Sequence, residues 1–175
     1  MKIKISTLLL LFFSLALFAQ DNFKRHNGDS FSLDYPNDWT HSKQTPNPAV
    51  KDIFLSPENT NKDDQFRENV NLTIEDISNF DLTLEAYTKK ALDQVKIQIP
   101  SAKVLSQTTT TINKMEVGLI IWSADFGNNM ILKFKQLFII SGQKAYVLTF
   151  SSSANEYDQY IEIGDRILNS FKLAK

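Results

Sequence analysis

The chain has 175 residues, with 19 basic and 20 acidic side chains, a formal net charge of −1 and no cysteine. The lack of cysteine excludes disulfide bonds and a lipid anchor on cysteine, so the core alone must hold the fold together. The sequence also lacks the basic stripe that nucleic-acid binding requires, and we expect no nucleic acid partner.

The first 19 residues have the pattern of a secretory signal peptide. Lys2 and Lys4 precede an apolar run from Leu8 to Phe18, and Ala19 is a small residue at the end of this run. The run is shorter than the roughly 20 apolar residues of a membrane-spanning helix. We therefore predict cleavage after Ala19, export to the periplasm or the cell exterior, and no membrane anchor after cleavage. An uncleaved N-terminal anchor is the alternative.

The remaining residues, 20–175, have the length of a single domain. Its first part alternates apolar and polar residues, which predicts short strands at residues 23–26, 30–35, 51–56 and 69–77. The tripeptide Asn27-Gly28-Asp29 is typical of a β-hairpin turn and should join the first two of these strands.

Two amphipathic helices are expected. The first should begin after Asp81, with Thr83 as its N-cap, and end at Pro100. The second should begin at Asn155, which can act as a cap. Gly164 lies in the middle of the second helix, where glycine costs about 1 kcal/mol relative to alanine. We interpret Gly164 as a point where the helix closely approaches the sheet.

Four longer strands lie between these helices, at residues 102–110, 115–126, 130–140 and 144–152. Their short connections predict antiparallel neighbours. In the second strand, Val117 and Leu119 point to one face while Ile120 and Trp122 point to the other, so both faces of the sheet should be covered. This predicts the α+β class, as an α/β/α sandwich whose central, mainly antiparallel sheet is flanked by helices.

No catalytic, cofactor or metal site is predicted, and we expect that the protein is not an enzyme. The two histidines, His26 and His41, do not have the spacing of a zinc motif, and we interpret them as solvated surface residues. A serine hydrolase that uses His41 is the weakest alternative, because no nucleophile motif accompanies it. The glycines are never clustered as in a phosphate-binding loop.

Calcium is the one metal for which acidic candidates exist. Glu58, Asp63, Asp64 and Glu68 surround a polar loop and could bind calcium loosely. They lack the spacing of a calcium-binding loop, so a solvated loop is the preferred interpretation.

Four segments, in their order along the chain, resemble PsbP-like domains. They are F-S-L-D-Y-P-N-D-W at residues 31–39, D-L-T-L-E-A-Y at 81–87, A-Y-V-L-T-F-S at 145–151 and R-I-L-N-S-F-K-L at 166–173. The resemblance covers most of residues 23–173 and implies one PsbP-like domain over residues 20–175, built as an α/β/α sandwich. It also implies binding to another protein rather than catalysis, and it transfers no functional residues.

Two hypotheses for the function follow. The first is an exported, non-enzymatic protein-binding module of the PsbP-like type, whose partner we expect to be another envelope or extracellular protein. The second is a small-molecule or lipid carrier with a pocket between the sheet and a helix. A cavity of at least about 300 Å³ with convergent polar groups would favour the carrier.

Overall fold

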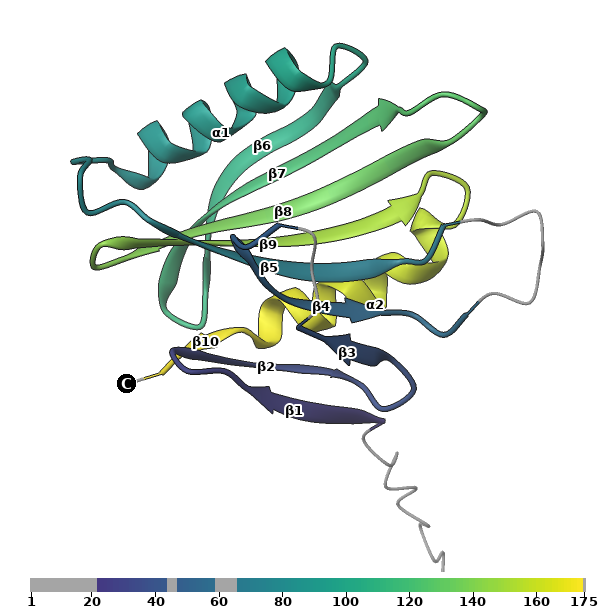
Figure 1. The fold of residues 1–175 in the computed structure, drawn as a ribbon, viewed down its shortest axis with the longest axis horizontal. Coiled ribbons are helices and arrows are strands. Elements are labelled where there is room, and N and C mark those ends of the chain that lie inside the picture. The colour runs from purple at the N-terminus through teal and green to yellow at the C-terminus, as the bar shows by residue number, and fades with distance from the viewer. Residues whose placement is uncertain (1–21, 44–46, 59–65, 175) are drawn as a thin grey trace, which may run out of the picture.

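The computed structural model describes residues 22–43, 47–58 and 66–174 (Figure 1). The predicted signal peptide, and Asp63 and Asp64 of the calcium hypothesis, lie outside these ranges. Within the described residues, the central sheet has seven strands in the order β3-β4-β5-β9-β8-β7-β6, and all neighbours are antiparallel. These strands are β3 (Thr40–Ser42), β4 (Val50–Leu55), β5 (Asn69–Asp76), β6 (Lys103–Ile112), β7 (Met115–Asp125), β8 (Ile131–Ser141) and β9 (Lys144–Ser153).

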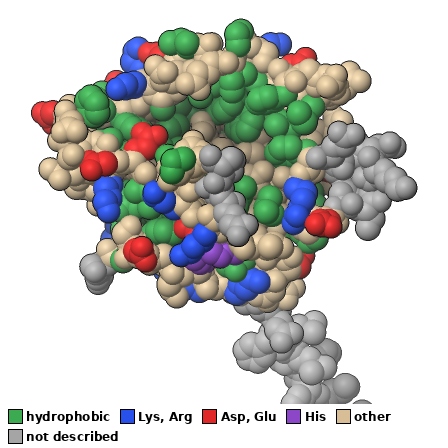
Figure 2. All heavy atoms as spheres, in the orientation of Figure 1, with side chains coloured by type: hydrophobic (Ala, Val, Ile, Leu, Met, Phe, Trp, Pro, Cys, Tyr) green, Lys and Arg blue, Asp and Glu red, His purple; other side chains and the backbone are tan. Residues whose placement is uncertain are grey.

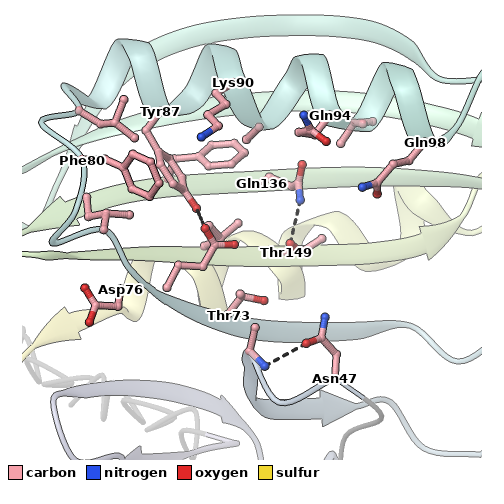
Figure 3. A pocket seen from close by; sticks show the side chains of 18 residues that line it. Asn47, Thr73, Asp76, Phe80, Tyr87, Lys90, Gln94, Gln98, Gln136 and Thr149 are labelled. Carbon is pink, nitrogen blue, oxygen red and sulfur yellow. Dashed lines mark hydrogen bonds between the residues drawn. The ribbon is translucent and has the colours of Figure 1, made fainter.

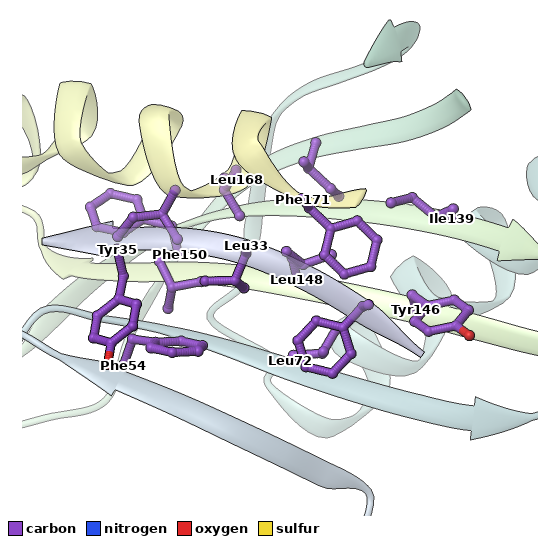
Figure 4. Close-up of a cluster of buried hydrophobic side chains, with 14 of the residues drawn as sticks. Leu33, Tyr35, Phe54, Leu72, Ile139, Tyr146, Leu148, Phe150, Leu168 and Phe171 are labelled. Atoms are coloured by element: carbon purple, nitrogen blue, oxygen red, sulfur yellow. The ribbon is translucent and has the colours of Figure 1, made fainter. Parts of the chain in front are cut away.

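One face of the central sheet packs against α2 (Tyr157–Ser170) and a small second sheet. The small sheet has the order β1-β2-β10, and its strands are β1 (Phe23–Asn27), β2 (Phe31–Pro36) and β10 (Lys172–Leu173). The predicted hairpin at residues 27–29 is confirmed, because β1 and β2 pair across it. Figure 4 shows the apolar cluster between these layers, where Leu33, Leu148 and Phe150 are fully buried.

The helix α2 approaches the sheet closely at Gly164, as predicted. A Cβ atom built on Gly164 would lie 2.8 Å from the ring of Phe150. The predicted start of this helix at Asn155 is wrong. The backbone N–H of Ala154 still donates to Ile131 at the end of the strand ladder, so a turn must follow before α2 begins at Tyr157.

The opposite face carries α1 (Leu84–Gln98). Its predicted N-cap is confirmed, since the Thr83 hydroxyl accepts a hydrogen bond from the Ala86 N–H at 3.2 Å. The helix lies over β7 and β8. It approaches β7 so closely that a Cβ atom on Gly118 would come within 2.5 Å of the Thr88 hydroxyl oxygen. Beneath the helix, Trp122 and Phe134 stack with ring centroids 4.0 Å apart.

The predicted α/β/α sandwich is therefore confirmed. Coverage of the two faces is unequal, because α1 rests on β7 and β8 and leaves the neighbouring β9 and β5 partly open on the same face. In the part of the chain that the structure describes, neither helix is long and apolar enough to cross a membrane.

Candidate binding groove

A groove of about 450 Å³ lies where α1 leaves the sheet uncovered (Figure 3). One wall is α1, the opposite wall is β5 with the segment at Asn47 and Ala49, and β8 and β9 form the floor. In the space-filling view of Figure 2, hydrophobic side chains gather in a hollow on this face. The groove therefore exists because α1 packs on β7 and β8 and leaves β9 and β5 partly uncovered.

The floor and the helix wall of the groove each carry apolar side chains among polar ones. Phe138 and Val147 come from the sheet and are buried, while Ala91 and Val95 come from α1 and are partly buried. These positions face each other because alternate residues of a strand lie on one face of the sheet, and residues three or four apart lie on one face of a helix. Both sets of side chains therefore point into the space between α1 and the sheet. An apolar ligand segment placed here would be removed from water.

One end of the groove holds a buried phenol bonded to a carboxylate. The Tyr87 hydroxyl donates to Glu75 Oε2 at 2.7 Å, and Figure 3 shows this bond crossing from α1 to β5. Burial raises the pKa of Tyr87 well above its ordinary value, and the hydrogen bond and negative charge of Glu75 raise it further. The phenol therefore stays protonated and acts as a donor at neutral pH.

Replacing Tyr87 with phenylalanine is expected to lower the free energy of unfolding by about 1 kcal/mol, since one hydrogen bond is lost while the exposed Glu75 regains water. Tyr157→Phe is the matched control, because the Tyr157 hydroxyl is buried without a hydrogen-bond partner. Removing that hydroxyl should leave stability unchanged or slightly raised. Chemical denaturation of both variants measures this difference, and equal losses would contradict the account.

The floor also contains an amide held in a fixed orientation. Gln136 Oε1 accepts from the indole N–H of Trp122 at 2.7 Å, and Gln136 Nε2 donates to the Thr149 hydroxyl at 3.0 Å. From the helix wall, Gln98 extends toward the strand that carries Gln136, and Gln94 lies beside it (Figure 3). Amide and hydroxyl groups thus lie beside the apolar side chains of the floor, as in many ligand sites.

A cation and an exposed aromatic ring stand at the mouth of the groove. Lys90 Nζ lies 4.7 Å from the ring centroid of Phe80, and Phe80 is 55% exposed. Lys90, Glu75 and Asp76 line the groove and leave it with nearly balanced charge. The mouth therefore offers one exposed aromatic ring and carries no strong electrostatic field of either sign.

The two histidines lie elsewhere, and the structure brings them together. His26 on β1 and His41 on β3 have ring centroids 4.3 Å apart, with side chains 12% and 20% exposed. Their interpretation as solvated surface residues was therefore wrong, because β1 packs beside the central sheet. No sequence pattern signals this meeting, since the two residues come from strands of different sheets.

A buried carboxylate, Asp52 on β4, completes this histidine cluster. His41 Nε2 lies 2.6 Å from Asp52 Oδ1 in a hydrogen bond. His26 Nε2 lies 3.3 Å from the same oxygen but lacks the geometry of a hydrogen bond. Burial lowers the pKa of His26, and the charges of His41 and Lys43 lower it further. The negative charge of Asp52 opposes this shift and raises the pKa.

The acidic calcium candidates that the structure describes do not form a shared loop site. Glu58 is exposed and lies 3.6 Å from Arg67. Glu68 is turned into the interior, where its Oε1 accepts from the Ser152 hydroxyl at 3.1 Å and the Ser153 N–H at 3.2 Å. Glu68 therefore has a structural role between β5 and β9.

Comparisons with known proteins agree with this architecture. A family model described as PsbP-like protein matches residues 18–173, while no curated protein matches significantly. Cyanobacterial PsbP (CyanoP) from Synechocystis sp. PCC 6803 aligns with a TM-score of 0.65 at 15% identity, over 87% of this chain and 93% of that chain.

Two further solved structures are similar. LpqN, which is involved in cell envelope biogenesis of Mycobacterium tuberculosis, aligns with a TM-score of 0.64 at 12% identity, over 89% of this chain and 93% of its own. A Pseudomonas aeruginosa protein of unknown function, PA94, aligns with a TM-score of 0.59 at 14% identity, over 85% and 95%. At such identities the likeness shows the fold alone.

Proposed function

The chain belongs to the PsbP-like protein family, and we propose that it is an exported, non-enzymatic binding protein whose ligand is a small amphipathic molecule held in the groove under α1. The groove carries this proposal. Its volume of about 450 Å³ lies within the range of small-molecule sites, and its lining combines apolar side chains with polar groups that hydrogen bonds hold in place. Export rests on the N-terminal pattern, and a mature chain beginning at Gln20 in mass spectrometry would support it.

The lining indicates the chemistry of the ligand. Three glutamine amides, from Gln94, Gln98 and Gln136, offer both donors and acceptors without charge. Phe138 and Val147 offer buried apolar surface beside these amides. Lys90 is the one cation among the described residues that line the groove, against the two carboxylates of Glu75 and Asp76, so the site has no excess cation for an acid. These features suit an uncharged molecule that combines hydroxyl or amide groups with an apolar chain.

A titration with octyl glucoside below its micelle concentration tests this proposal, because this probe joins an uncharged hydroxylated head to an apolar chain. We expect saturable shifts of the side-chain amide signals of Gln94, Gln98 and Gln136 in NMR spectra. Ala91→Trp places a large ring in the groove and should weaken binding at least tenfold. Lys96→Trp adds the same ring at an exposed α1 position outside the groove and should leave affinity unchanged. Equal binding by both variants would contradict the proposal.

A second candidate is binding to an envelope or extracellular protein. It rests on exposed apolar side chains at the end of the sheet where α1 ends and β6 begins, beside the β7–β8 turn. These residues are Ile97, Val104, Leu105, Phe126, Met130 and Ile131, with exposures of 71%, 37%, 54%, 43%, 39% and 48%. Such patches are typical of interaction surfaces.

Proximity labelling in the native envelope, with the wild type and an Ile97→Ser/Ile131→Ser variant, tests this second candidate. A partner that is labelled by the wild type and lost in the variant supports it. Unchanged labelling in the variant would contradict it.

A further inference from the structure

A site separate from the groove is formed where the small sheet meets the edge of the central sheet. We propose that His26, His41 and Asp52 bind a divalent transition-metal ion of the zinc class, which joins the two sheets. The three residues come from β1, β3 and β4, and their ligand atoms all lie within 4.8 Å of one another. The groove is lined by other residues, so this proposal is independent of the proposed function.

The distances between the ligand atoms are compatible with one ion. Zinc bonds of about 2.0–2.2 Å at tetrahedral angles separate neighbouring ligand atoms by about 3.4 Å. His26 Nε2 and Asp52 Oδ1 already lie 3.3 Å apart. His41 Nε2 lies 2.6 Å from the same oxygen, so the ion would replace this hydrogen bond and widen the gap by less than about 1 Å.

An unpaired nitrogen supplies a second, independent observation. His26 Nε2 is buried and has no hydrogen-bond partner, although it lies beside a carboxylate that is itself almost fully buried. A buried polar atom without a partner costs free energy. A metal ion between His26 and Asp52 would satisfy the nitrogen lone pair and compensate the buried negative charge at the same time.

The donor set identifies the class of metal. Two imidazole nitrogens and one carboxylate oxygen suit zinc and neighbouring transition metals, whereas calcium and magnesium prefer oxygen ligands alone. Three protein ligands leave a coordination position for water. His41 is 20% exposed, and Figure 2 shows a histidine side chain at the surface of this face, so an ion can reach the cluster.

The ion would stabilise the junction between the small sheet and the central sheet. β1 belongs to the small sheet, whereas β3 and β4 form the edge of the central sheet. The sequence contains no cysteine, so no disulfide can cross-link the two sheets. Binding of the ion to the folded state alone should therefore raise the melting temperature, by an amount that grows with the logarithm of the ion concentration divided by its dissociation constant.

Zinc titration of protein purified without a histidine tag tests the proposal directly. The chain has two histidines, so the imidazole nitrogen signals in long-range ¹H–¹⁵N spectra can all come from the cluster. We expect one Zn²⁺ per chain, with large shifts of the Nε2 signals of both histidines and a higher melting temperature. Nε2 signals that do not move at saturating Zn²⁺ would overturn the proposal without any mutation.

Variants then locate the ion. His26→Gln and Asp52→Asn should each weaken Zn²⁺ affinity by at least about tenfold, measured by competition with a chromophoric chelator. Asp93→Asn, which removes a partly buried carboxylate on α1, should leave the affinity unchanged. Circular dichroism confirms that each variant is folded before titration. An affinity that is unchanged in folded His26→Gln would also overturn the proposal.

Discussion

Replacing Phe171 with alanine is expected to lower the free energy of unfolding by about 3–5 kcal/mol, the range for loss of a buried phenylalanine. Phe171 is 1% exposed and follows directly after α2. Its ring stacks on Phe31 at 5.8 Å and lies 5.9 Å from Tyr146, as Figure 4 shows for the surrounding cluster. It therefore anchors the end of α2 between β2 and β9.

Urea denaturation of Phe171→Ala and of the neighbouring Lys172→Ala measures this effect. Lys172 is exposed, so its variant should change the free energy of unfolding by less than about 0.5 kcal/mol. A loss below about 1.5 kcal/mol for Phe171→Ala would contradict the central position of this ring in the core.

Replacing Gly164 with valine is expected to destabilise the protein by about 2–3 kcal/mol, although glycine is normally a poor helix residue. A Cβ atom at this position would lie 2.8 Å from the Phe150 ring, and Phe150 is fully buried. Either α2 must move away from the sheet or the ring must leave its packed position. The cost of this overpacking exceeds the gain in helix propensity.

Glu162→Val is the matched control, because it introduces the same side chain at an exposed position of α2. The double variant Gly164→Val/Phe150→Leu should recover part of the loss caused by Gly164→Val, since the smaller side chain makes room for the added methyl groups. A more stable Gly164→Val protein would show that the helix does not approach the sheet this closely.

Much of the fold could be predicted because its signals are local. Alternation along residues 115–126 and short turns predicted β7 and its antiparallel neighbours, and Thr83 predicted the start of α1. Asn155 misled the prediction of α2, because a capping residue type does not show whether the strand before it has ended.

The sites were harder to predict because they depend on contacts between distant segments. Gln136 did leave a signal, since it is a polar residue between Phe134 and Phe138 on a buried face of β8. That position predicts a polar partner in the core, but not that α1 leaves a groove above it. His26 and Asp52 lie in different sheets, and the packing of those sheets cannot be read from strand periodicity.

The central claim is that the groove under α1 holds an amphipathic ligand, and isotope-filtered NOE spectroscopy with octyl glucoside tests it most directly. The account predicts contacts between the octyl chain and the methyl groups of Val95 and Val147, which line the groove. Contacts confined to Ile97 and Ile131 at the exposed apolar end, or no contacts at saturating probe, would contradict it.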